Sequence, residues 1–354
     1  MKPDRVLGIC LLVLIILGLV FVYSSSYYRA MKRGETSTFY LFAHAKRLGI
    51  ALIFFIIGYM LPYDRIRKLI LPVFLLLVIA LFATLIAGRM QFGARRSVTI
   101  ISTFGLQVSE FIRIWIIFFL ANFFDAHPQT ANSAKGTLTT IAICLFLIAL
   151  VAVQPSISMA VISLAVLISM LILGSTKMKV LFPTVIVSVA IIVLLIVLFP
   201  HARHRITSFI SNPTYQVKQS LIAIGSGGLF GKGPGAGLQK FMFLPRIHND
   251  FIFAHIAEEF GFIGTLVLFV LYGAIFLRSL SIAAAVNDDY SKLIVMGLNA
   301  SIFIIFLIHV GVSIGLLPPT GVPLPFISFG GWSMAANLFA IGIILQISRK
   351  REYA

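Results

Sequence analysis

The chain has few charged residues, which make up 11% of its 354 residues, whereas a soluble domain carries about 25%. Acidic residues are the scarcest, with 11 aspartates and glutamates against 28 lysines and arginines. Hydrophobic residues make up 60% of the chain, and apolar runs long enough for a spanning helix recur along its whole length. The composition therefore excludes an ordinary soluble domain and predicts a protein that crosses a membrane several times.

Cysteine is also rare. The two cysteines, Cys10 and Cys144, lie inside apolar runs, far apart and without the spacing of metal ligands. We interpret both as small buried apolar residues. The apolar runs are continuous and do not alternate with polar residues, which excludes a transmembrane barrel and predicts helices.

The first apolar run follows Lys2 and Arg5 but lacks a small-residue cleavage site, so we interpret it as a retained span. We predict an all-α polytopic membrane protein with ten transmembrane helices, forming a single domain over residues 1–354. The expected spans are 6–28, 47–61, 69–88, 107–124, 137–153, 156–174, 180–199, 251–277, 293–317 and 326–347.

An even number of spans places both termini on one side of the membrane, and the basic residues at both ends favour the cytoplasm. With that orientation the outer loops hold at least as many cations as the cytoplasmic ones, against the usual rule. A basic outer surface indicates an anionic ligand. The outer cations are Arg29, Lys32, Arg33, Lys46, Arg47, Arg89, Arg95, Arg96, Arg203, Arg205, Lys218, Lys232, Lys240 and Arg246.

The connection between spans seven and eight is the one long polar stretch. We predict an extracytoplasmic loop over 200–250, which is glycine-rich between Gly225 and Gly237. Connections of this length are usually functional or disordered. The loop ends at Asp250, directly before an apolar helix. Asp250 is either a helix cap or, with His248 and Glu258 nearby, a general base with a raised pKa.

Charged residues within a span usually mark a functional site. Glu110 and Arg113 share one face of the fourth span, as a structural ion pair or as part of a polar cavity. Arg95 and Arg96 precede that span, and their guanidinium groups suit phosphate oxygens. Anchoring to lipid headgroups is the alternative for these two arginines.

Two further segments combine glycine or proline with polar residues. Lys232 lies in GLFGKGPGAG, which resembles a phosphate-binding loop in composition only, and we exclude ATP because no Ser or Thr follows the lysine. Ser328 lies in the segment 315–331, whose prolines and glycines predict a broken helix lining a cavity. His309, in the ninth span, is more readily a packing histidine than a proton relay.

Several motifs together resemble the SEDS family of membrane proteins, which comprises FtsW, RodA and SpoVE. They are VYSSS, GARRS, LQVSE, QSLIAIGSGGLFGKGPG, FLPRIHNDFIFAHIAEEFGFIG and GLLPPTGVPLPFISFGG. The resemblance covers nearly the whole chain, and the last three motifs are highly specific. VYSSS and GLQKFMFLP are closer to the FtsW branch than to the RodA branch.

The resemblance implies a glycosyltransferase that polymerises lipid II at the outer face of the bacterial cytoplasmic membrane. The catalytic aspartate of the family falls on Asp250, with His248 in the same motif, and the polar cavity residues fall on Arg96, Glu110, Arg113 and Gln219. We predict that the substrate is bound by Arg95, Arg96, Glu110, Arg113, Gln219, Lys232, His248 and Ser328. It also implies a divalent cation, Mg²⁺ or Mn²⁺. The implied partners are undecaprenyl-linked glycan, a class B penicillin-binding protein and other division or elongation proteins, and no nucleic acid.

The sequence departs from the family pattern at Ser97, Val108, Arg113, Ser156 and His309. Two other functions remain open. A lipid II flippase would also need many spans and intramembrane charges, but it would carry polar groups through the full membrane depth. A scaffold for the penicillin-binding protein would tolerate these departures but would not need Asp250.

Overall fold

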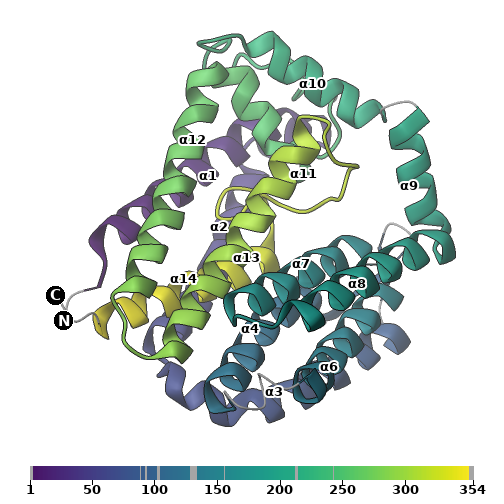
Figure 1. Ribbon diagram of the computed structural model, residues 1–354. Helices are drawn as coiled ribbons and strands as arrows, with labels where there is room; N and C mark the ends of the chain where they lie inside the picture. Colours follow the sequence, from purple (N-terminus) through teal and green to yellow (C-terminus); the bar gives the residue numbers. More distant parts are fainter. Residues whose placement is uncertain are drawn as a thin grey trace.

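The computed structural model describes residues 3–87, 89–91, 94–101, 104–127, 134–154, 156–211, 214–241 and 243–350. Its long helices confirm the helical fold class (Figure 1). They are α1 (Arg5–Lys32), α2 (Phe39–Met60), α3 (Tyr63–Ala87), α4 (Ser109–Ala126), α6 (Ala134–Val153), α7 (Ile157–Leu173), α8 (Met178–Leu198), α12 (Ile252–Ala284), α13 (Asp289–Ser313) and α14 (Gly331–Ile347).

Each predicted span overlaps one of these helices. Eight stretches of helix within the described residues are long and apolar enough to cross a membrane, and these lie in α1, α2, α3, α6, α8, α12, α13 and α14. The helix α7 is apolar but shorter, with 17 residues. The helix α4 has 18 residues and carries Glu110, Arg113 and Asp125. The chain is therefore a multi-pass membrane protein, and the count of ten spans stays a prediction.

The segment predicted as a long loop is largely helical. It forms α9 (Pro200–Ser211), α10 (Tyr215–Gly227) and the short helix α11 (Ile247–Asp250), with turns between α10 and α11. In Figure 1, α9 links the end of α8 to α10, which packs against α12. The apolar residues of SLIAIGSG explain this packing, because Ala223 and Gly227 are buried.

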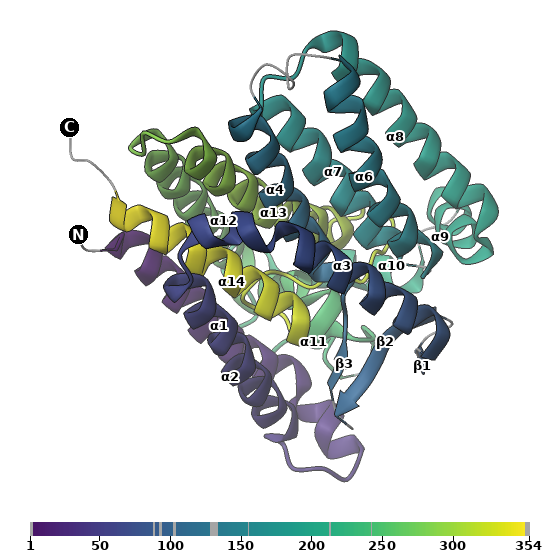
Figure 2. The ribbon, with the colours of Figure 1, turned by 90° about the horizontal axis from the view of Figure 1, so that it is seen from below.

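A small antiparallel sheet connects α3 to α4, which the sequence analysis did not predict. Its strands are β1 (Arg89–Gln91), β2 (Ala94–Ile101) and β3 (Phe104–Leu106), in the order β1-β2-β3. Met90 pairs with Arg95 and Val98 with Leu106. Figure 2 shows this sheet beyond the end of α3.

Small residues allow the closest pairing of helices, between α2 and α14. A Cβ atom on Gly58 would lie 2.5 Å from the Phe339 carbonyl oxygen, and one on Gly342 would lie 2.5 Å from that of Phe55. Such close backbone approach is the usual way in which helices associate in a membrane. The helices α12 and α13 instead pack through aromatic rings, with Tyr272 stacked on Phe306 at 4.2 Å.

The two ends of the chain meet at one end of the helices (Figure 1). The backbone N–H of Asp4 donates to Ser348 Oγ at 3.0 Å, and Asp4 Oδ2 lies 2.5 Å from Arg278 Nη2 near the end of α12. Ser348, directly after α14, contacts Asp4, whereas Ser328, three residues before α14, donates to the Asn249 carbonyl of α11 at 2.8 Å. The termini and the Asp250 region are therefore separated by the length of α14.

Candidate functional site

Asp250 ends the short helix α11, and its side chain is 11% exposed. Asn249 Nδ2 donates to Asp250 Oδ1 at 2.7 Å, and Arg246 Nη1 lies 3.8 Å from Asp250 Oδ2. Burial raises the pKa of Asp250 to about 6, although the charges of Arg246 and Arg205 lower it. A carboxylate with this pKa is ionised at neutral pH and remains a competent proton acceptor.

The segment that follows α13 fixes the backbone of α11. Ser328 Oγ donates to the Asn249 carbonyl at 2.8 Å, and Phe329 N donates to the His248 carbonyl at 3.0 Å. Leu324 N donates to Ser328 Oγ at 2.9 Å, so the buried hydroxyl joins two backbone segments. Ser328 therefore positions the residues beside Asp250, whereas the sequence predicted that it contacts substrate.

His248 contacts two aromatic rings. Its ring centroid is 5.1 Å from that of Tyr40 and 5.5 Å from that of Phe329. Burial lowers the pKa of His248 to about 3, and the charges of Arg29, Arg47, Arg33 and Arg246 add to this effect. His248 is therefore neutral at pH 7 and does not act as a cation toward a ligand.

Glu110 and Arg113 lie close together in the interior of the protein. Arg113 Nε lies 3.6 Å from Glu110 Oε2, and the two side chains are 0% and 2% exposed. Arg113 also donates to Ser301 Oγ on α13 at 2.6 Å and to Asn337 Oδ1 on α14 at 2.8 Å. This geometry is the structural ion pair that the sequence left as one alternative, and substrate binding by these two residues stays a prediction.

The glycine-rich loop packs against the start of α12, and its polar groups face that helix. Lys232 Nζ lies 3.0 Å from Oε1 of the buried Glu258. The same carboxylate accepts from Leu238 N at 2.8 Å and from Gln239 N at 3.2 Å. Glu258 thus neutralises Lys232 and satisfies two backbone donors, which leaves Lys232 poorly suited to the predicted ligand contact.

A second carboxylate, that of Glu259, neutralises a lysine in the next part of the loop. Glu259 Oε1 lies 2.8 Å from Nζ of the fully buried Lys240, which also donates to the Gly235 carbonyl. Ser24 Oγ on α1 lies within 2.9 Å of both Glu259 oxygens. We refer to Lys232, Lys240, Glu258 and Glu259 as the loop clamp. The adjacent acids of an apolar helix were the sequence signal for it.

The structure shows fewer contacts for the remaining predicted site residues. Gln219 is half-buried on α10. Arg95 and Arg96 belong to β2, and their side chains lie outside the described part of the structure. His309 Nδ1 lies 2.8 Å from the Val322 carbonyl, as expected of a packing histidine. Binding roles for Gln219, Arg95 and Arg96 therefore stay predictions.

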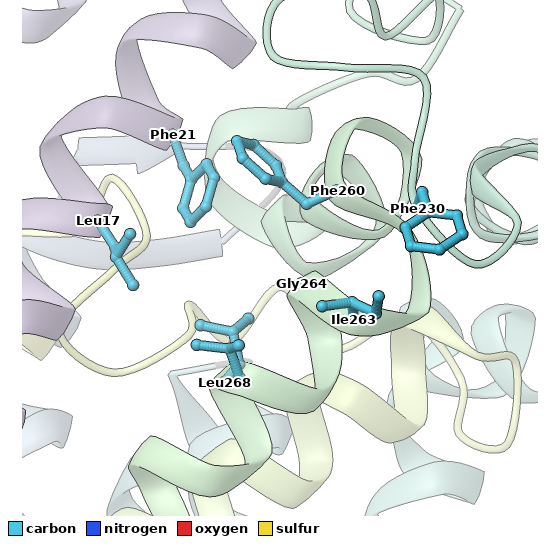
Figure 3. A pocket seen from close by; sticks show the side chains of 8 residues that line it. Leu17, Phe21, Phe230, Phe260, Ile263, Gly264 and Leu268 are labelled. Carbon is cyan, nitrogen blue, oxygen red and sulfur yellow. The ribbon is translucent and has the colours of Figure 1, made fainter.

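An apolar cavity of about 300 Å³ lies between α1 and α12 (Figure 3). Phe21 and Phe260 meet above it with their centroids 5.4 Å apart, and Phe230 of the glycine-rich loop lies at its side. Its lining offers no group for acid–base chemistry. The lining residues are Leu17, Phe21, Phe230, Phe260, Ile263, Gly264, Val267 and Leu268.

Sequence reasoning missed the aromatic and cationic side chains around His248. Arg33 Nη1 donates to Tyr40 Oη at 2.9 Å, and Arg47 Cζ lies 3.9 Å from the centroid of Phe329. Arg33 and Arg47 appeared in the sequence only as members of the basic outer set. Their excess over the cytoplasmic cations was the available signal, but it did not show which of them converge.

Comparison with known proteins places this geometry in context. The family model described as cell cycle protein, which covers FtsW, RodA and SpoVE, matches residues 4–353. The stage V sporulation protein E of Bacillus subtilis is 32% identical and aligns over 99% of this chain and 98% of its own length. A probable peptidoglycan glycosyltransferase FtsW of Trichlorobacter lovleyi is 33% identical, over 98% of this chain and 93% of that protein.

Two solved structures share the fold. A chain from a structure titled for the coordination of polymerization and crosslinking by a peptidoglycan synthase complex superposes with a TM-score of 0.78 and 21% identity, covering 99% of each chain. RodA of Thermus thermophilus superposes with a TM-score of 0.73 and 22% identity, covering 100% of this chain and 99% of RodA. The match to the family model across nearly all of the sequence shows that the chain belongs to the FtsW, RodA and SpoVE family.

Proposed function

We propose that this protein is a peptidoglycan glycosyltransferase that polymerises lipid II at the outer face of the cytoplasmic membrane. The observation that carries the proposal is the largely buried carboxylate of Asp250, which has a pKa of about 6 and lies near several arginines. The names of relatives such as the probable FtsW of Trichlorobacter lovleyi support the same activity.

Asp250 acts in this proposal as the general base. Its carboxylate accepts the proton of an acceptor sugar hydroxyl as that oxygen attacks the anomeric carbon of a lipid-linked donor. The bond from that carbon to the diphosphate breaks, and undecaprenyl diphosphate leaves with the bonding electrons. Asn249 and Arg246 hold the carboxylate from one side, and a positioned base of this kind contributes about 10²–10⁴-fold to a rate.

A divalent cation remains a proposal that follows from the resemblance. Among the residues the structure describes, no three His, Cys, Asp or Glu side chains are placed to hold a metal ion together. Mg²⁺ commonly binds through substrate phosphates with few protein ligands. We therefore propose that Mg²⁺ or Mn²⁺ enters with the diphosphate of the substrate.

The proposed partner is a class B penicillin-binding protein in a division or elongation complex. The fold match to a chain from a peptidoglycan synthase complex supports it. We also propose that both termini are cytoplasmic. The contact between Asp4 and Ser348 joins the two ends, and α14 separates them from the Ser328–Asn249 contact beside Asp250, which supports an outer position for the site.

Glycan polymerisation from labelled lipid II tests the activity directly. The purified protein with its penicillin-binding partner and Mg²⁺ is compared with the variants Asp250→Ala and Asp250→Asn. We expect polymer from the unmodified protein and a loss of at least about 100-fold in both variants, because each removes the proton acceptor. Asp289→Asn is the matched control, since that exposed aspartate lies at the start of α13.

Three other results of this experiment would each favour a different conclusion. Polymer from Asp250→Ala at the unmodified rate would remove the base assignment but leave the enzyme. No polymer from any variant of a well-folded complex would favour the scaffold alternative. Transfer of lipid II between leaflets without polymer would favour the flippase.

A further inference from the structure

Arginines from the end of α1 and from α2 converge on α11. Arg33 Nη1 donates to Tyr40 Oη at 2.9 Å, and the Arg47 guanidinium lies 3.9 Å above the Phe329 ring. The Tyr40 and Phe329 rings, 5.8 Å apart, both contact the ring of His248. We refer to Arg29, Arg33, Arg47, Tyr40 and Phe329 as the arginine–aromatic cluster.

The charge of this cluster is strongly positive. Arg29, Arg33, Arg47 and Arg246 all lie close enough to His248 to lower its pKa by their charge. His248 itself is neutral, and the carboxylate of Asp250 lies 3.8 Å from Arg246. Like charges gathered in a partly dry site repel one another, and an anion bound among them relieves that repulsion.

Arg29 adds an open hydrogen-bond donor. Its Nε atom is buried and has no hydrogen-bond partner among the described residues. A buried charged donor without a partner is costly unless a ligand supplies the acceptor. Arg29, Arg33 and Arg47 are each at least partly exposed, so a ligand can reach them.

A diphosphate fits this arrangement better than a single carboxylate. Guanidinium groups bind phosphate oxygens in pairs, and a diphosphate presents several such oxygens on two adjacent phosphorus atoms. The ring of Phe329 and the hydroxyl of Tyr40 hold two of the guanidinium groups in place before any ligand arrives. Preorganised donors lose less conformational freedom on binding.

The position of the cluster matches the reaction proposed above. His248 contacts the aromatic rings of the cluster, and Asp250 lies two residues further along the same short helix. We propose that Arg29, Arg33 and Arg47 bind the diphosphate of the polyprenyl-linked sugar while Asp250 faces the reacting hydroxyl. This assignment rests on the proposed glycosyltransferase activity, and it goes beyond the phosphate contact that the sequence predicted for Arg95 and Arg96.

Binding of labelled undecaprenyl diphosphate tests the assignment without catalysis. The protein is placed in nanodiscs of phosphatidylcholine, and all measurements use the Asp250→Ala background, in which no turnover is expected. We expect Arg29→Gln and Arg33→Gln each to raise the Kd about tenfold or more, because each removes charge-assisted hydrogen bonds. Arg203→Gln, an exposed arginine of α9, is the matched control and leaves the Kd unchanged.

Competition identifies the source of the phosphate group. Inorganic pyrophosphate and undecaprenyl monophosphate should compete weakly, and anionic phosphatidylglycerol should not compete at the concentrations that saturate the diphosphate. Equal competition by phosphatidylglycerol would make the cluster a general lipid-headgroup site and overturn the proposal. An unchanged Kd in both Arg29→Gln and Arg33→Gln would overturn it as well.

Folding and activity are separated by two further measurements. Arg33→Lys keeps the charge but not the two-pronged geometry, so it should bind more tightly than Arg33→Gln and less tightly than the parent. Thermal unfolding of each variant identifies any that is misfolded. If the protein binds the diphosphate but makes no polymer with Asp250 intact, the glycosyltransferase proposal fails and the diphosphate site stands.

Discussion

At the scale of single residues, burial acts in opposite directions on two neighbours. It lowers the pKa of His248 to about 3 and raises that of Asp250 to about 6. Burial disfavours the charged form of both groups, which is the protonated form of histidine and the ionised form of aspartate. At neutral pH the site therefore combines a neutral imidazole with an ionised carboxylate, a state suited to proton abstraction.

The pKa of Asp250 predicts the acid limb of the pH–rate profile. The base form is lost as pH falls through about 6, so kcat/KM for glycan synthesis should drop by about tenfold per pH unit below that value. Arg246→Gln removes the largest of the charges that lower this pKa, so the limb should move to higher pH. Initial rates between pH 4.5 and 8 measure both, and an acid limb unmoved by Arg246→Gln would contradict the assignment.

The buried pair on α4 gives a prediction about stability. Arg113→Met leaves Glu110 buried without its partner, and breaking such a pair typically costs about 3–5 kcal/mol. The double variant Glu110→Gln/Arg113→Met should recover much of that loss, because neither charge remains. Unfolding midpoints in detergent measure the difference between the single and the double variant.

The same double variant tests the binding role that the sequence assigned to these residues. If Glu110 and Arg113 only join α4 to α13 and α14, the double variant should still polymerise lipid II when it is folded. A folded double variant without activity would support the predicted substrate contact. Equal destabilisation of the single and double variants would show that the pair is not what stabilises this region.

The sequence singled out Asp250 as the candidate base, because an acid at the threshold of an apolar helix is conspicuous. It could not identify its neighbours, because Tyr40 and Phe329 are ordinary aromatic residues of apolar segments and meet only in the folded chain. The partner of Lys232 was hidden for the same reason. The glycine-rich surroundings of Lys232 suggested a ligand, whereas its partner Glu258 lies 26 residues further along.

At the scale of elements, the glycine-rich loop and α12 fit together through two glycines. Gly231 has φ +83°, and a Cβ atom there would lie 2.2 Å from the Glu259 carbonyl oxygen. Gly261 interrupts α12 with φ +65°, and a Cβ atom there would lie 2.3 Å from Gly231 N. The loop can pack this closely only because α12 is interrupted at Gly261, and both positions require glycine.

Substitution in the loop separates backbone strain from collision. Gly231→Ala meets both a positive φ and the Glu259 carbonyl, whereas Gly235→Ala meets a φ of +75° with no atom within 4 Å of the new Cβ. We expect Gly231→Ala to lower the unfolding midpoint further, since strain of about 1–3 kcal/mol is joined by overpacking. Differential scanning fluorimetry in detergent compares the two, and equal midpoints would contradict the interlocked arrangement.

The apolar runs predicted each long helix because length and hydrophobicity decide where a spanning helix forms. The segments between them were less predictable. The helix α10 is stabilised by packing against α12, whereas α9 is mostly exposed, and the strands β1 to β3 pair over a short stretch with no alternating pattern. A signal that depends on contacts elsewhere in the chain is not readable from the local sequence.

At the scale of the whole molecule, the predicted even number of spans and the proposed cytoplasmic termini can be tested by labelling the two sides of the membrane separately. Cys10 and Cys144 are buried and can be replaced by alanine, which leaves a chain for single-cysteine labelling. Arg203→Cys on α9 should react with a membrane-impermeant maleimide in intact cells. Asn287→Cys, exposed between α12 and α13, should react only after the membrane is opened. Reaction of both in intact cells would contradict the proposed orientation.

The loop clamp also bears on how the chain enters a membrane during synthesis. A charged side chain in an inserting helix is costly, by about 2.5–3.5 kcal/mol at the helix centre, and α12 carries two adjacent buried glutamates just before its break at Gly261. The ribosome makes Lys232 26 residues before Glu258 and Lys240 19 residues before Glu259. The counter-ions thus leave the ribosome first, and α12 reaches the translocon with partners that already exist for both of its acids.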